Sequence, residues 1–180
     1  TDGFRSRFSQ SIPIVSDNYG LMNGYEFNYY QELMDEMVSS FTFYAKTINS
    51  ITGEDVRISE RLYIPSSKLR GFKRGKVGPI DSNDYVGGNY LSTVNFAATL
   101  PNVLPNWQNA DFSVFLDAGN VWGVDYSSSV DDSNTIRSAA GIALDWHTPV
   151  GPLSFSYAGV LSKADTDKTE SFRFNLGTTF

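Results

Sequence analysis

The sequence contains no cysteine and a single histidine, His147. Without thiols there is no disulfide framework and no thiolate metal site, and one imidazole has no second imidazole with which to share a metal. We therefore expect no metal site and no cofactor. No apolar run approaches the roughly 20 residues that a membrane-spanning helix needs. The net charge of −6 argues against nucleic acid as a partner.

Aromatic residues, in contrast, are abundant. The chain of 180 residues has ten Tyr and thirteen Phe, yet its mean hydropathy is a mildly polar −0.26. A transmembrane β-barrel reconciles these two values, because one face of each strand meets lipid while the other meets a polar lumen.

The hydrophobic pattern has a period of two and almost no helical spacing. It predicts eight strands, at about residues 4–15, 24–33, 38–50, 89–100, 111–121, 135–146, 151–160 and 171–180. Strands of about ten residues suit a tilted membrane crossing. The fold class that we expect is therefore all-β, a transmembrane antiparallel β-barrel.

The strands present two different faces. We expect one face to meet lipid, with Val94, Phe96, Ala98, Phe112, Val114, Leu116, Ile142, Leu144, Trp146, Leu153, Phe155 and Tyr157. The opposite face contains Asn95, Asp117, Asp145 and Ser154. Long and short connections alternate along the chain, which predicts that both chain ends are periplasmic. Residues 51–88 form a long irregular insertion, a feature that usually carries function.

The last predicted strand alternates without interruption and ends on an aromatic residue. Phe172, Phe174, Leu176 and Phe180 share one face. A terminal Phe on such a strand resembles the C-terminal signal by which bacterial outer-membrane proteins are recognised for insertion. Gly177 weakens pairing inside the strand and permits a kink, which suits a gate, although a packing role explains a glycine equally well.

Four motifs carry a family resemblance. They are Leu69-Arg70-Gly71-Phe72, Phe115-Leu116-Asp117-Ala118-Gly119, His147-Thr148-Pro149-Val150-Gly151-Pro152-Leu153 and the terminal Phe180. In this order and spacing they closely resemble the BamA family of outer-membrane assembly factors, in the bacterial surface antigen superfamily. The resemblance is strong over about residues 61–180, and over residues 1–60 it rests on the strand pattern alone.

The resemblance implies a clamp inside the barrel. In the family, an Arg-Gly-Phe tip of the sixth extracellular loop folds into the lumen and meets the Asp of a Phe-x-Asp-x-Gly motif on the thirteenth strand. Arg70 would thus meet Asp117, and its guanidinium fork suits a carboxylate. Many relatives offer a second partner, a Glu, near the position of Asn95. Here that residue is a neutral amide, which leaves Asp117 as the main counter-charge.

The same region has a simpler interpretation as an exposed basic loop. Five cations lie within nine residues, namely Lys68, Arg70, Lys73, Arg74 and Lys76. Gly71 and Phe72 favour the clamp, because the glycine permits a tight bend and the aromatic ring can wedge against a barrel wall.

Family members carry periplasmic POTRA domains before a sixteen-stranded barrel. The resemblance therefore implies that residues 1–180 are the C-terminal half of such a barrel, with strands nine to sixteen and the sixth loop at about 51–88, and without the upstream POTRA domains. A half-barrel has two open edges that demand a partner, either the missing N-terminal half or a second copy. Closure of the eight strands as a small barrel is the alternative.

The resemblance implies a protein that folds and inserts other β-barrel proteins into the bacterial outer membrane, through a lateral seam and β-augmentation. Its partners would be the lipid bilayer, nascent β-barrel clients and accessory lipoproteins. Alternatives are a two-partner secretion or translocation pore of the same superfamily, or a small structural barrel. We expect no enzymatic activity, because the carboxylates lack a nucleophile and base combination.

Overall fold

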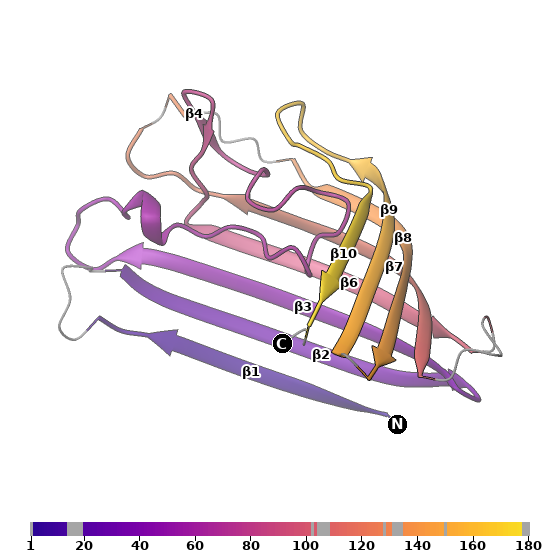
Figure 1. Ribbon diagram of the computed structural model, residues 1–180. Coiled ribbons are helices and arrows are strands. Elements are labelled where there is room, and N and C mark those ends of the chain that lie inside the picture. The colour runs from indigo at the N-terminus through magenta and orange to yellow at the C-terminus, as the bar shows by residue number, and fades with distance from the viewer. Residues whose placement is uncertain are drawn as a thin grey trace.

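The computed structural model describes residues 2–13, 20–101, 103, 109–127, 129–130, 135–149 and 151–177. Eight antiparallel strands form one sheet in the order β1-β2-β3-β6-β7-β8-β9-β10 (Figure 1). They are β1 (Gly3–Ser11), β2 (Gly20–Met34), β3 (Met37–Ser50), β6 (Tyr90–Leu100), β7 (Ala110–Trp122), β8 (Arg137–Thr148), β9 (Gly151–Ser162) and β10 (Phe172–Leu176). No helix among the described residues is long and apolar enough to cross a membrane.

The prediction of eight antiparallel strands is confirmed, and several predicted ends are corrected. β2 begins at Gly20 and not at 24, because backbone pairing continues to Gly20 opposite Ser50 although side-chain alternation has already stopped. β8 ends at Thr148, so His147 lies in the strand, beyond the predicted end at 146. β10 ends at Leu176, and the predicted residues 178–180 lie outside the described part of the chain.

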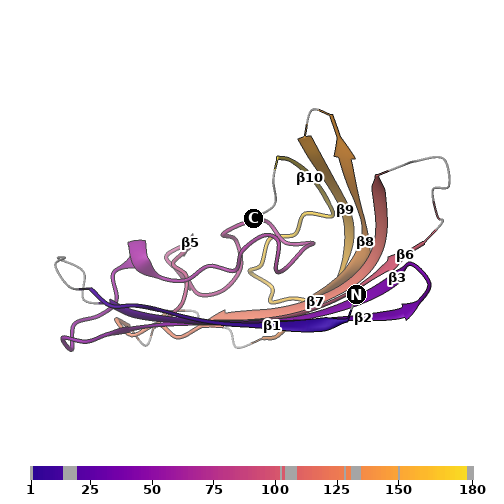
Figure 2. The same ribbon diagram turned by 90° about the horizontal axis from the view of Figure 1, so that it is seen from below.

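The segment between β3 and β6, residues 51–89, is called the long loop below. Its predicted irregularity is interrupted by the 3-10 helix η1 (Ile58–Glu60) and by a small hairpin of β4 (Ile80–Asp81) and β5 (Asp84–Tyr85). Figure 2 shows that the sheet is curved and that the long loop lies on its concave side.

The two faces of the sheet differ in burial as the alternation predicts. On the outer, convex face Phe96 is 49% exposed and Leu116 opposite it is 43% exposed. One residue along β7, Phe115 is 5% exposed and faces the concave side. Aromatic pairs continue across the outer face, with ring centroids 4.9 Å apart for Phe41 and Phe96.

The main hydrophobic core lies between the inner face of the sheet and the long loop. The sheet contributes Ile48, Leu91, Val121 and Ala139, and the loop contributes Val56, Leu62, Ile64, Leu69, Phe72 and Val77. The loop is therefore held in the hollow of the sheet by burial of apolar side chains. β1 and β10 are the two edges of the sheet, so the eight strands do not close on themselves as a small barrel.

Candidate functional site

Arg70 and Asp117 form a two-pronged ion pair at the centre of the inner face. The Nε atom of Arg70 lies 2.7 Å from Oδ2 of Asp117, and Nη2 lies 2.8 Å from Oδ1. The backbone N–H of Arg70 also donates to Oδ2, at 3.0 Å. The Asp117 side chain is fully buried and that of Arg70 is 20% exposed. Parallel charge-assisted bonds of this kind fix the orientation of both side chains.

The neighbouring strand β6 supplies a further donor to the same carboxylate. Asn95 lies opposite Asp117 in the register, and its Nδ2 atom is 2.9 Å from Oδ1 of Asp117. The same amide nitrogen is 2.7 Å from the carbonyl oxygen of Lys68 in the long loop. The neutral amide thus binds the carboxylate and the loop backbone, which is a role that a Glu side chain could not fill without a proton.

The residues beside Arg70 fit the loop tip against the sheet. The Arg70 guanidinium carbon lies 3.4 Å from the centroid of the Phe115 ring, which is a cation–π contact. Gly71 has a φ of 89°, and a Cβ atom there would lie 3.1 Å from that of Ala139 and 3.2 Å from that of Ala158. Phe72 is 2% exposed and packs in the core. The small side chains of β8 and β9 therefore allow the close approach of the loop.

Two other residues of the predicted motifs have packing positions. Leu69 is 2% exposed and belongs to the main core. A Cβ atom at Gly119 would lie 2.8 Å from Cγ2 of Thr93 and 3.0 Å from the carbonyl oxygen of Ser92. Gly119 thus permits close packing of β7 against β6.

The basic run around Arg70 separates into two kinds of residue. Lys68 is paired, with Nζ 2.8 Å from Oε1 of Glu26 on β2. Lys73, Arg74 and Lys76 are exposed. The interpretation as a solvated surface therefore fits these three residues and does not fit Lys68 or Arg70.

The predicted C-terminal residues lie at the edge of the sheet. Phe172, Phe174 and Leu176 are exposed on the outer face. Gly177 follows with a φ of 120°, and its N–H donates to the carbonyl oxygen of Pro152 at 3.0 Å. No heavy atom of the described residues lies within 4 Å of a Cβ placed at Gly177, so their positions do not support a packing role for this glycine. Phe180 lies outside the described residues.

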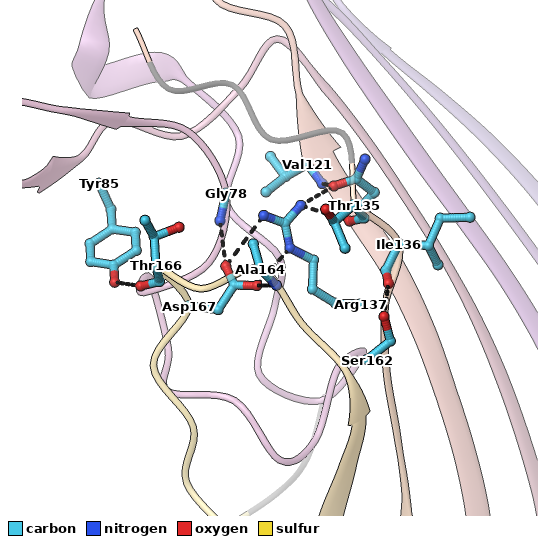
Figure 3. Close-up of polar contacts among 11 residues, drawn as sticks. Gly78, Tyr85, Val121, Thr135, Ile136, Arg137, Ser162, Ala164, Thr166 and Asp167 are labelled. Atoms are coloured by element: carbon cyan, nitrogen blue, oxygen red, sulfur yellow. Dashed lines mark hydrogen bonds and ion pairs between the residues drawn. The ribbon is translucent and has the colours of Figure 1, made fainter.

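A further ion pair, between Arg137 and Asp167, was not predicted (Figure 3). Nε of Arg137 lies 2.9 Å from Oδ2 of Asp167, Nη2 lies 3.3 Å from Oδ1, and both side chains are fully buried. Asp167 also accepts the N–H groups of Ala164 at 2.7 Å and Gly78 at 3.4 Å. This pair fastens the connection before β10 to β8 and to the long loop. The alternation of side chains along β8 places Arg137 on the inner face, which was a usable signal in the sequence. Asp167 lies in an irregular segment, where no such pattern indicates its direction.

Another ion pair fixes the beginning of the long loop. Arg61, whose side chain is fully buried, donates to Asp125 in the connection after β7 and to the carbonyl oxygen of Val56. Partial burial raises the pKa of Asp125, but hydrogen bonds from the Val56 N–H, Asn89 and Arg61 outweigh burial and hold the pKa below its ordinary value.

These contacts hold separate segments of the chain together. Among the described residues, no cluster of three or more His, Cys, Asp or Glu side chains could bind a metal ion. The inner-face site is thus a docking site for the long loop on β6, β7, β8 and β9.

Comparison with known proteins agrees with this architecture. The Omp85 superfamily domain matches residues 1–180. The chain is 28% identical over 146 residues to the outer membrane protein assembly factor BamA of Neorickettsia risticii, covering 79% of the chain and 20% of the relative. It is 33% identical over 141 residues to BamA of Neisseria meningitidis serogroup B, covering 62% of the chain and 17% of the relative.

A solved structure shares the fold. The crystal structure of BamA from Haemophilus ducreyi lacking POTRA domains 1-3 superposes with a TM-score of 0.83 at 31% identity, covering 96% of this chain and 38% of that one. The chain thus spans about a fifth of the length of its curated relatives. With its domain match, its eight-stranded sheet and its inner-face site, it belongs to the Omp85 superfamily and, within it, to the BamA family of bacterial outer-membrane proteins, as the C-terminal part of the barrel.

Proposed function

We propose that the full-length protein containing this chain folds and inserts other β-barrel proteins into the outer membrane. In this proposal the eight strands are strands nine to sixteen of a sixteen-stranded barrel, the long loop is its sixth extracellular loop, and POTRA domains precede the barrel. The relatives are assembly factors by name, which supports the same role here.

The proposed mechanism rests on the place of β10 at one edge of the eight-stranded sheet. A strand at the edge of a sheet presents unpaired N–H and C=O groups, which form a template for another strand. In the closed barrel the first strand would cover this edge. When that seam opens, an incoming client strand would pair with β10 by β-augmentation. The lipid bilayer and accessory lipoproteins are further partners in this proposal.

A site-specific photo-crosslinking amino acid at Phe174 tests the mechanism in the full-length protein in cells. Phe96 is the matched control, because both side chains are 49% exposed on the outer face, while β6 is paired on both sides. We expect crosslinks to newly made outer-membrane β-barrels from position 174 and none from 96. Equal crosslinking from both positions, or normal levels of outer-membrane proteins after depletion of this protein, would contradict the proposal.

A further inference from the structure

Arg173 on β10 binds the turn that presents Arg70. Its Nη1 atom lies 2.7 Å from the carbonyl oxygen of Ser66, and Nη2 lies 2.6 Å from that of Phe72. Glu170 orients the guanidinium, with Oε2 3.1 Å from Nε and 2.9 Å from Nη2. Arg173 therefore spans the base of the Ser66–Phe72 turn, while Arg70 binds at its tip.

The chain just before β10 pairs with the same turn. Phe72 and Thr169 form an antiparallel bridge, and the N–H of Lys73 donates to the carbonyl oxygen of Lys168 at 2.9 Å. Two residues upstream of Thr169, the buried Asp167 is held by Arg137. The approach to β10 is thus fixed to the long loop by backbone and side-chain bonds together.

β10 itself has little other support. Among the described residues its ladder with β9 runs from Phe172 to Leu176, with one further backbone bond on either side, whereas β2 pairs with β3 from Gly20 to Met34. A short edge strand of this kind opens locally at low free-energy cost unless another contact fixes it.

We propose that Arg173 is a positioning residue that clasps β10 to the long loop and thereby keeps the free edge of β10 extended and in register for an incoming strand. This inference rests on the proposed function. Arginine suits the task because its planar fork reaches two carbonyl groups at once, whereas a lysine ammonium is a point charge on a flexible stem. The long loop, already fixed to β7 through Arg70 and Asp117, serves as the rigid support.

Hydrogen exchange of the full-length protein in lipid nanodiscs tests the clasp without any client. Loss of several charge-assisted hydrogen bonds in Arg173→Gln should speed exchange of the β10 amides by about tenfold or more. Amides of β6 and β7 should not change. Arg74→Gln is the matched control, because it removes the same charge from an exposed position of the long loop to which Arg173 binds. Arg173→Lys, which keeps the charge beside Glu170, should give an intermediate rate.

Unchanged β10 exchange in Arg173→Gln would overturn the clasp, and faster exchange throughout the sheet would make Arg173 a residue of general stability instead. Crosslinking from Phe174 then separates this inference from the proposed function. If the Arg173→Gln variant loses both the protection of its β10 amides and its client crosslinks, the result supports the clasp and the proposed function. If β10 loses protection and the client crosslinks remain, the clasp is real but does not position the strand for addition. If unsubstituted Arg173 protein gives no client crosslinks, the proposed mechanism fails.

Discussion

Asp117 is fully buried on the inner face of β7, and Arg70 of the long loop satisfies both of its carboxylate oxygens. The backbone N–H of Arg70 and the amide of Asn95 donate to the same carboxylate. Four donors from two segments thus converge on one buried charge. Such a charge is stable only while its partners remain in place, so loop position and strand geometry depend on each other.

The first prediction concerns this pair in the full-length protein. Arg70→Ala and Asp117→Ala should each destabilise the barrel, because each leaves an uncompensated charge. Removing one partner of a completely buried ion pair destabilises a protein by about 3–5 kcal/mol, and because Arg70 is partly exposed we expect a value near the lower end of that range. The double variant should lose less stability than the sum of the losses in the two single variants. Thermal unfolding, followed by the shift in gel mobility on heating, measures this coupling. Strict additivity would show that the two side chains act independently.

The second prediction concerns the lipid face. Phe155→Arg places a cation among outward aromatic side chains, where Phe155 lies 5.0 Å from Phe174 between ring centroids. A cation near the bilayer midplane costs about 2–4 kcal/mol, so insertion should be impaired. Ser154→Arg is the control, since this neighbour faces inward and binds Asp145. The amount of heat-modifiable protein in membranes measures insertion. Equal damage from both substitutions would show that the faces are wrongly assigned.

The third prediction concerns Gly71. Alanine there must adopt a positive φ and also places its Cβ against Ala139 and Ala158. The backbone conformation costs about 1–2 kcal/mol, and crowding adds about 1–3 kcal/mol. Gly75→Ala isolates the backbone cost, because its φ is 65° and no heavy atom lies within 4 Å of an added Cβ. The midpoint of thermal unfolding of Gly71→Ala should therefore be well below that of Gly75→Ala. Similar unfolding midpoints for the two variants would mean that the loop tip can move away from Ala139 and Ala158 without loss of stability.

The fourth prediction concerns acid stability. The pKa of Asp125 is lower in the folded protein than its ordinary value of 3.8. Its stabilisation is thus fully present above that ordinary value and is lost as the pH falls through the lowered folded-state pKa. The contribution of this partly exposed pair is at most about 1 kcal/mol. The loss of thermal stability between pH 5 and pH 2.5 should be smaller in Asp125→Asn. An unchanged pH profile in that variant would exclude the contribution.

Much of the fold could be predicted from the sequence, because each barrel strand carries its own alternating pattern of apolar and polar residues. Alternation of apolar and polar side chains is set by the pleat of each strand, so residues such as Phe96 and Leu116 reveal their face without knowledge of their neighbours. The Arg70 and Asp117 motifs were found in another way, through the resemblance of their short sequences to those of a known family. Strand ends were less predictable, because backbone pairing at Gly20 continues after the side-chain pattern has stopped.

The sequence by itself determined the two-faced strands and the long loop, and its resemblance to a known family indicated the residues of the central ion pair. Only the tertiary structure decided that Arg137 meets Asp167, that Lys68 meets Glu26 and that Arg173 clasps the turn at Ser66 and Phe72. These contacts join segments as far as 107 residues apart, and at least one partner in each pair lies in an irregular segment. Irregular segments have no periodicity that predicts side-chain direction, so their partners are set by how the loop packs into the hollow of the curved sheet.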